Sequence, residues 1–305
     1  LPEGNYWTSM TQKPYRLSMY AQDKLEHQGF VAIAGLNLDF VDPNGEWYVL
    51  DVYDEQFYSS NYSPEQDDQY QKEKLKVDMS LSPRLAISHP ITEVSKLYFN
   101  YGHYQQMPIA QDLYRIRRGN NNEVINMGDP VLPMAKTISY ELGYDHAFKD
   151  MYLIHLSAYY KDILDQQDYT EYISANSKVI YYQLTSNSYE DIRGFELELA
   201  KIRGDWITGQ VNYEYRVNTS GYFGVKKYFE NPSEQRYYIL KNPKQSKPRP
   251  TPRIKSVIDL HTPLQFGPKI AGQYLLGDWH INVLSYWRTG SWFTYNPNNV
   301  PGIEY

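Results

Sequence analysis

Apolar and polar residues alternate along ten segments of this chain, a period of two that is typical of β-strands with one apolar and one polar face. The segments are residues 14–24, 29–41, 81–90, 96–105, 136–148, 151–163, 189–201, 206–216, 253–262 and 277–288. In 136–148, for example, Tyr140 and Leu142 lie on one face and Glu141 on the other. Most segments reach the ~9–11 residues that a membrane-crossing strand needs, whereas strands of soluble sheets average ~5–6.

The connections between these segments alternate between short turns and long polar loops. The short ones lie near 25–28, 91–95, 149–151 and 202–205, and the long ones near 42–79, 105–134, 164–188 and 217–252. Successive antiparallel strands place their connections at opposite ends of a sheet, so one end collects turns and the other collects loops. Outer-membrane barrels have this asymmetry. The sequence therefore predicts an all-β fold, an antiparallel transmembrane β-barrel with short periplasmic turns and long extracellular loops.

Aromatic residues support the membrane interpretation. Tyrosine accounts for 32 of 305 residues and suits both pleated surfaces and membrane interfaces, where the ring is apolar and the hydroxyl polar. Several aromatic residues lie near segment ends, as interfacial girdles require: Tyr15, Phe40, Phe148, Tyr152, Trp206, Tyr215 and Trp279. A soluble, tyrosine-rich β protein such as a carbohydrate-binding module is the alternative.

Composition gives no indication of an enzyme or a cofactor site. The chain has no cysteine for disulfides or thiolate metal sites, and its net charge of −6 argues against nucleic acid as a partner. It contains no nucleophile elbow, HExxH, P-loop or dinucleotide fingerprint. The seven histidines are scattered singly, so no metal site is predicted. His155, on a predicted polar face, is expected to be a hydrogen-bonded histidine rather than a ligand.

The long loops supply the candidate ligand contacts. The loop around 51–68 is rich in carboxylates, which suit calcium, but its spacing matches no EF-hand and we favour a solvated loop. The basic loop from Lys226 to Arg253 could contact lipopolysaccharide phosphates or pair with the acidic loop, and here too we favour a solvated loop. The candidate ligand-binding residues, chosen as aromatic residues in or beside long loops, are Tyr53, Tyr58, Tyr62, Tyr70, Tyr104 and Tyr114.

Charged residues recur on the face that would line the barrel lumen. They are Asp39, Arg84, Glu141, Lys161, Glu196, Glu198, Glu214 and Arg216. Two of these carboxylates could act as the acid and base of a glycoside hydrolase. We favour a cross-strand network of opposite charges that stabilises the interior of a wide barrel.

Several short motifs occur in an order that resembles one family. Residues 20–44 contain Tyr-Ala-Gln-Asp-Lys and then Gly-Leu-Asn-Leu-Asp-Phe-Val-Asp-Pro, which is similar to the barrel signature of TonB-dependent outer-membrane receptors. Asn37 stands where that family often has Arg. Later matching segments are 82–88, 98–102, 139–143, 158–163 and 193–196. The likeness is closest to large Bacteroidetes-type receptors with a carboxypeptidase-regulatory-like N-terminal domain.

The resemblance implies a barrel of about 22 strands around an N-terminal plug, energised through the TonB–ExbB–ExbD complex. Residues 1–305 would then be a partial barrel that opens in loop-like sequence at 1–5 and stops at 299–305 before the last strands. Ten unclosed strands would leave two unpaired edges in lipid, which is not viable, so we expect the rest of the barrel to be missing from this sequence or supplied elsewhere. The plug is likewise expected to lie outside residues 1–305.

The expected function is uptake of a scarce ligand (a glycan, peptide or chelate), with this chain forming wall and extracellular loops. Aromatic and amide side chains suit glycans or peptides best. The expected partners are outer-membrane lipid, lipopolysaccharide, the TonB complex through a plug, and a surface lipoprotein. A passive porin-like channel or a scaffolding barrel in a surface complex is the alternative from another functional class.

Overall fold

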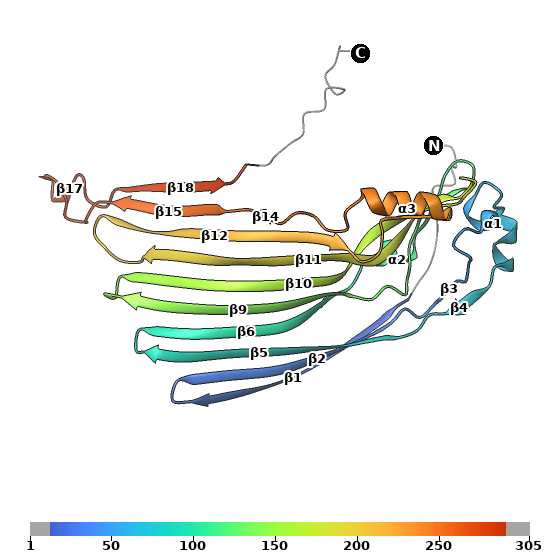
Figure 1. Ribbon diagram of the computed structural model, residues 1–305. Helices are drawn as coiled ribbons and strands as arrows, with labels where there is room; N and C mark the ends of the chain where they lie inside the picture. Colours follow the sequence, from blue (N-terminus) through green and yellow to red (C-terminus); the bar gives the residue numbers. More distant parts are fainter. Residues whose placement is uncertain (1–12, 291–305) are drawn as a thin grey trace, which may run out of the picture.

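The computed structural model describes residues 13–290, so the segments 1–5 and 299–305 considered above lie outside the described residues. Ten long strands form one antiparallel sheet in chain order (Figure 1). They are β1 (Tyr15–His27), β2 (Phe30–Asp42), β5 (Asp78–Thr92), β6 (Ser95–Gln106), β9 (Ala135–Phe148), β10 (Tyr152–Ile173), β11 (Ile180–Lys201), β12 (Ile207–Tyr222), β15 (Arg253–His261) and β18 (His280–Arg288). The ten predicted strands and their antiparallel order are confirmed. In the described part of the chain β1 and β18 do not pair, so the sheet is an open wall.

Short elements occupy the connections. The strands are β3 (Glu46–Tyr48), β4 (Lys72–Lys74), β7 (Ile116–Arg118), β8 (Val124–Met127), β13 (Lys227–Phe229), β14 (Arg249–Pro250), β16 (Lys269–Ile270) and β17 (Gln273–Tyr274). The helices are α1 (Glu55–Tyr58), the 3-10 helix η1 (Pro64–Gln69), α2 (Ala110–Tyr114) and α3 (Pro232–Lys241). None of the described helices is long and apolar enough to cross a membrane.

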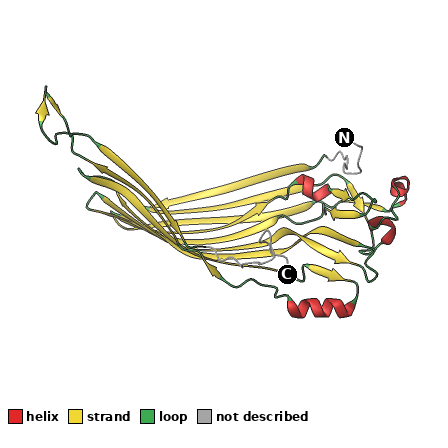
Figure 2. Cartoon of the chain, turned by 90° about the horizontal axis from the view of Figure 1, so that it is seen from above, coloured by secondary structure: helices red, strands yellow, loops and turns green. Residues whose placement is uncertain are grey.

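The two ends of the wall differ as the loop lengths predicted. The helices of the described residues gather at one end, and the β16–β17 hairpin lies at the other end, beyond the short turns (Figures 1 and 2). The turn between β1 and β2 has only two residues, Gln28 and Gly29, which adopt positive φ angles of 47° and 80°. Two consecutive positive φ values are the mark of a type I′ turn, whose twist matches that of the flanking strands.

One predicted loop is wrong. Residues 164–188 are mostly strand, because β10 continues to Ile173 and β11 begins at Ile180. The pairing register shifts twice between Ile163 and Asp168, and Asp165 adopts a positive φ of 56°. A β-bulge breaks the two-residue alternation without ending the pairing, so the sequence pattern stops where the strand does not. The β10–β11 hairpin therefore extends well beyond the other strands at the long-loop end.

Cross-strand register separates the two faces of the wall. One row of directly paired residues is Phe99, Leu142, Ala158, Phe195 and Tyr215. The adjacent row, on the opposite face, is Asn100, Glu141, Tyr159, Gly194 and Arg216. The apolar row is open to the surroundings, and Leu142 is 50% exposed. An exposed apolar face this wide is expected where lipid, rather than water, surrounds a sheet.

Aromatic rings mark both borders of the apolar face. Tyr101, Tyr140 and Tyr160 are directly paired and form a ladder with ring centroids 5.1 and 6.3 Å apart toward the long loops. At the short-turn end, Phe148 contacts Tyr152 with centroids 6.1 Å apart. Trp206 packs edge-on against Phe266 there, and Trp279 is 61% exposed. Tyr215, in contrast, lies within the apolar row because β12 continues past it to Tyr222.

Candidate functional site

At the long-loop end, the first two long loops pack onto the extended β10–β11 hairpin. A buried cluster, which we call the loop core, consists of Phe57, Tyr58, Ile116, Val124, Met127, Val179 and Tyr181. The Tyr58 ring stacks on Tyr181 with centroids 4.0 Å apart, and Phe57 has no exposed surface. The first loop is therefore partly a packed element and only partly the solvated loop that we favoured from its sequence.

The hairpin supports this packing by pairing with short strands from two loops. β8 adds to β11 in parallel through Tyr182 and Asn126, and β13 adds to β10 in parallel through Tyr172 and Tyr228. These parallel pairs are exceptions to the antiparallel order of the main sheet. They attach the loops before β9 and after β12 to one common scaffold, so the long loops form an ordered cap.

Several hydrogen-bonded polar side chains lie along one side of the loop core. Asp67 accepts hydrogen bonds from the hydroxyls of Tyr48 and Tyr62, both at 2.9 Å, and from the Lys72 ammonium at 3.1 Å. Burial alone would raise the pKa of Asp67. The three donors together lower the pKa by more than burial raises it, so the pKa of Asp67 lies below its ordinary value. Burial, followed by the bond to Asp67, raises the pKa of Tyr62 to about 12.

Arg118 is a half-buried cation of this group. Its guanidinium lies 3.3 Å from the Tyr62 ring centroid and donates to the backbone carbonyls of Phe57 and Asn122 at 2.9 and 2.8 Å. Burial is the main cause that lowers the Arg118 pKa. Because guanidinium binds rings and carbonyls at once, Arg118 connects the first loop to the β7–β8 hairpin.

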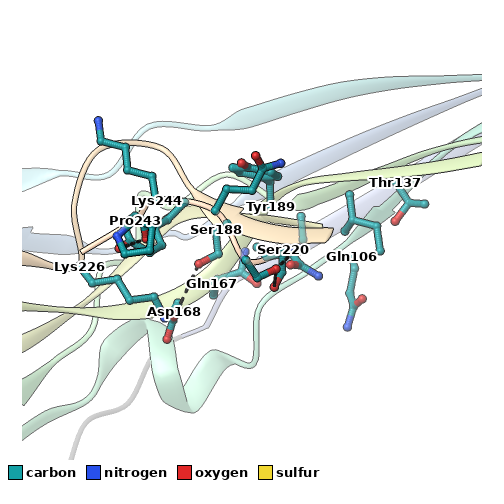
Figure 3. Close-up of a pocket in the computed structure, with 17 residues that line it drawn as sticks. Gln106, Thr137, Gln167, Asp168, Ser188, Tyr189, Ser220, Lys226, Pro243 and Lys244 are labelled. Carbon is teal, nitrogen blue, oxygen red and sulfur yellow. Dashed lines mark hydrogen bonds and ion pairs between the residues drawn. The ribbon is translucent and has the colours of Figure 1, made fainter. Parts of the chain in front are cut away.

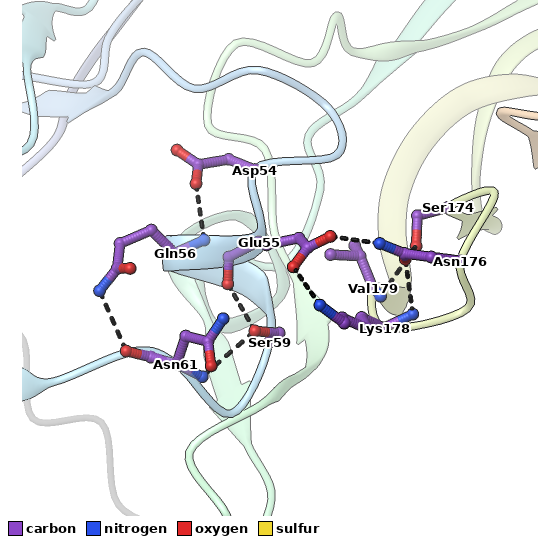
Figure 4. Close-up of polar contacts among 9 residues, drawn as sticks. All are labelled: Asp54, Glu55, Gln56, Ser59, Asn61, Ser174, Asn176, Lys178 and Val179. Carbon is purple, nitrogen blue, oxygen red and sulfur yellow. Dashed lines mark hydrogen bonds and ion pairs between the residues drawn. The ribbon is translucent and has the colours of Figure 1, made fainter.

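The acidic loop also contacts the tip of the β10–β11 hairpin (Figure 4). Glu55 accepts from the Asn176 amide and from the Lys178 ammonium, the latter at 3.2 Å. The Asp54 carboxylate caps α1 by accepting a hydrogen bond of 2.8 Å from the backbone N–H of Gln56. Within 51–68, where every residue is described, no three ligand atoms converge closely enough to hold a metal ion. The carboxylates Asp54, Glu55 and Asp67 instead bind protein donors.

A polar cavity of about 660 Å³ lies at the base of the loops (Figure 3). We call it the loop-base cavity. Its polar lining includes Gln106, Gln167, Asp168, Ser188, Ser220 and Lys226. The Lys226 ammonium lies 2.6 Å from Asp168, and the Ser220 hydroxyl lies 3.1 Å from that of Ser246. Amides, hydroxyls and one ion pair in a space of this size suit a ligand with many hydrogen-bonding groups.

A second cavity, of about 560 Å³, lies on the same polar face and is called the mid-wall cavity. Its polar lining includes Tyr20, Asn37, Arg84, Asn100, Tyr104 and Glu141. The Arg84 guanidinium lies 4.8 Å from the Tyr104 ring centroid. The polar face thus carries two recesses, one at mid-height and one under the cap.

The family model for TonB dependent receptor-like β-barrels matches residues 2–303. The chain belongs to this family. No curated protein matches the chain.

The chain is similar to several solved structures, and the match with a TM-score above 0.5 supports a shared fold. The hemophore receptor HasR of Serratia marcescens, in complex with its hemophore HasA and heme, is 11% identical with a TM-score of 0.52, and the match covers 94% of this chain and 52% of that one. The copper transporter OprC is 12% identical, with a TM-score of 0.45 and coverage of 90% and 39%. The ferric enterobactin receptor PfeA of Pseudomonas aeruginosa is 10% identical, with a TM-score of 0.43 and coverage of 92% and 54%. The chain spans about half or less of their length.

All eight charged residues predicted for the lumen lie on the polar face of this TonB-dependent receptor-like wall. Their direct partners are mostly residues that the sequence analysis did not single out. Arg16 lies 3.0 Å from Asp39, Tyr98 donates to Glu141 at 3.0 Å, and Tyr159 donates to Glu214 at 2.6 Å. Arg253 pairs with Glu214 on its other oxygen. These partners could have been found from the alternation, since each lies on the polar face of its own segment.

The other charged residues predicted for the lumen lie opposite residues of neighbouring strands, but they do not form one continuous series of ion pairs. Glu196 is directly opposite Glu214, and Glu198 is opposite His155. His155 itself is hydrogen-bonded to Asp145 at 2.5 Å, which confirms the expected hydrogen-bonded histidine. Lys161 lies 5.6 Å from the Tyr159 ring centroid. A continuous lumen network through these residues stays a prediction.

The six predicted ligand-binding tyrosines occupy three different places. Tyr53, Tyr58, Tyr62 and Tyr70 belong to or pack against the loop core. Tyr114 is 4% exposed and packs with Leu75 and Leu113 in a smaller cluster, whereas Tyr104 is 47% exposed and lines the mid-wall cavity. Tyr114 also lines a small cavity of about 170 Å³. The role of the six tyrosines as ligand contacts stays a prediction.

The basic loop forms ion pairs with β10, and none of its described ion pairs is with the acidic loop. Lys226 contacts Asp168, as above, and Lys227 contacts Glu171. The direct link to the first loop is a hydrogen bond of 3.3 Å from the Tyr53 hydroxyl to the Tyr228 carbonyl. The loop also contains α3, which we did not predict. Its sequence carried the signal, because Asn231 caps the helix and Pro232 follows at its first turn.

Proposed function

We propose that this chain forms part of the barrel wall and the extracellular loops of an outer-membrane receptor that imports a scarce ligand. The loop-base cavity is the observation that carries the proposal. It lies under an ordered cap and opens on the polar face, where a ligand released from the loops would next arrive. Family membership supports uptake driven by TonB.

The exposed apolar face supports placement in the outer membrane. Leu142, Leu156 and Leu199 are 45–50% exposed on one face of the wall, bordered by aromatic rings. A soluble carbohydrate-binding module would not expose so wide an apolar surface, so this alternative is disfavoured. Outer-membrane lipid and, at the loop end, lipopolysaccharide are the proposed surroundings of this face.

The chemistry of the loop-base cavity favours a glycan or a peptide as the ligand. Its amides and hydroxyls can donate and accept, and the Lys226–Asp168 pair adds one charge of each sign. Tyr104 offers an aromatic face lower on the same wall, and the tyrosines of the loop core hold the cap in place. A chelate is the third ligand class that the proposal includes.

The proposal extends to parts beyond this chain. They are the rest of a barrel of about 22 strands, a plug that contacts TonB–ExbB–ExbD, a carboxypeptidase-regulatory-like N-terminal domain of the Bacteroidetes type, and a surface lipoprotein partner. The rival function is a passive porin-like or scaffolding barrel, which needs neither a plug nor TonB.

Uptake by cells that produce the full-length protein tests the proposal. We expect a labelled oligosaccharide or peptide from a defined panel to accumulate in cells with TonB and not in cells without it. Ser220→Trp, which fills the loop-base cavity, should reduce uptake at least tenfold, whereas Ser233→Trp on the exposed surface of α3 should not. Entry that is independent of TonB would favour the passive channel, and recovery of the protein from the soluble fraction would overturn the membrane assignment.

A further inference from the structure

The end of the wall opposite the loops brings three side chains of types that can ligate metals close together. Asp259 and His261 lie on β15, and His280 is the first residue of β18. His261 and His280 are directly paired in register, and Asp259 is two residues along the same face. Their ligand atoms all lie within 4.8 Å of one another, which no other such group among the described residues achieves. We call these three residues the rim cluster.

Hydrogen bonds on the far side of each ring orient both histidines. His261 Nε2 lies 2.7 Å from the Gly204 carbonyl oxygen, which can only accept, so this nitrogen carries a proton. His280 Nε2 lies 3.2 Å from the Asp278 carboxylate. Both Nδ1 atoms then face the same oxygen of Asp259, at 3.3 Å from His261 and 2.9 Å from His280.

One of these contacts is unsatisfied. His261 Nδ1 is shielded from solvent and forms no hydrogen bond, although the Asp259 oxygen lies 3.3 Å away. With the ring proton on Nε2, Nδ1 presents a lone pair to a carboxylate oxygen, and two acceptors repel at this distance. A cation between them would remove the repulsion and would satisfy both atoms.

We propose that the rim cluster binds Zn²⁺ through His261 Nδ1, His280 Nδ1 and an oxygen of Asp259. Two imidazoles and one carboxylate form a typical zinc set, whereas calcium and magnesium take oxygen ligands. Bonds of ~2.0–2.2 Å in a tetrahedron place ligand atoms about 3.4 Å apart, a separation that small side-chain rotations reach from the present arrangement.

The surroundings of the cluster also fit a metal site. Histidines that bind zinc commonly donate their second nitrogen to a carbonyl or a carboxylate, the roles that Gly204 and Asp278 have here. Gly204 adopts a φ of +147°, which few other residues tolerate, so the position of its carbonyl depends on glycine. The metal would connect the β11–β12 turn, β15 and β18 at one edge of the wall.

Metal titration of the full-length receptor in detergent tests this site. After removal of bound metal with a chelator, we expect one equivalent of Zn²⁺ to bind by calorimetry. Co²⁺ should give the visible absorption of a tetrahedral site that zinc displaces. His280→Ala should weaken binding more than about 100-fold, and Asp278→Asn about 10- to 100-fold, as expected for an orienting partner.

His155→Ala is the matched control, since His155 also contacts a carboxylate on the polar face, that of Asp145, but has no second histidine beside it. It should bind Zn²⁺ as the unmodified protein does, and heat-modifiable gel mobility checks that each variant is folded. The proposal is overturned by an absence of saturable Zn²⁺ binding, by binding that survives His280→Ala, or by equal loss in His155→Ala. None of these readouts depends on ligand uptake, so failure here leaves the proposed function standing.

Discussion

The wall and the cap of this molecule arrange apolar side chains in opposite ways. On the wall, Leu142 is 50% exposed while Glu214 on the other face is 3% exposed. In the cap, Phe57 is completely buried and the carboxylate of Glu55 lies at the surface. Apolar surface is stable against lipid but is driven inward by water. Apolar side chains are exposed on the wall and buried in the cap, which indicates that lipid surrounds the wall and water surrounds the cap.

Removing the centre of the loop core should have the largest effect. Phe57→Ala should cost about 3–5 kcal/mol of cap stability, because Phe57 is fully buried among aromatic rings. Hydrogen exchange should increase in 47–70, 116–127 and 174–181 while the ten long strands stay protected. Phe266→Ala, at the opposite end and 38% exposed, is the control. Loss of protection throughout the wall would show that cap and wall are one cooperative unit.

A charge on the apolar face should have the next largest effect. Leu142→Arg should destabilise the folded protein by about 2–4 kcal/mol in lipid vesicles, because an exposed wall position would meet hydrocarbon. Asn100→Arg, which adds the same side chain on the polar face one strand away, should change the free energy of unfolding by less than about 1 kcal/mol. Urea unfolding measures both. Equal effects would mean that lipid does not contact the Leu142 face.

Acidification should weaken the cap by the smallest amount. The pKa of Asp67 is lowered in the folded protein, so its stabilising contribution is complete above the ordinary carboxyl pKa of ~3.9 and is lost as pH falls through the lowered value. Asp67→Asn should cost about 1 kcal/mol of cap stability at neutral pH and should remove this acid-dependent loss. Exchange rates in 47–70, measured from neutral pH to well below the ordinary carboxyl pKa of ~3.9, test this prediction.

Asp68→Asn is the control for this prediction, since Asp68 lies next to Asp67 in η1 and is exposed. It should leave both the neutral stability and the acid-dependent loss unchanged. An acid-dependent loss that persists in Asp67→Asn would assign the effect to another carboxylate of the cap.

Much of the wall could be read from sequence because its determinants are local. Alternation of period two gave the face of each residue, and the loop lengths gave the order and the two unlike ends. The alternation did not predict the course of β10 at the bulge near Asp165, where extra residues interrupt the period of two while strand pairing continues. The hairpin that supports the cap was therefore missed.

The candidate site was harder to predict because its contacts join distant segments. The tyrosines of the first loop were proposed as ligand contacts from loop composition, but the burial of Tyr58 depends on Tyr181 and Met127, far along the chain. His261 and His280 are scattered in sequence, and only the register of β15 with β18 places them side by side.

By itself, the sequence determined an antiparallel wall with one apolar and one polar face, its ten strands, and the end that carries the long loops. These features follow from backbone geometry and from the side on which each residue must lie. Only the tertiary structure decided which tyrosines are packed and which face a cavity, where the polar recesses lie, and that two lone histidines share one carboxylate. Such features depend on distances between segments that no local pattern records.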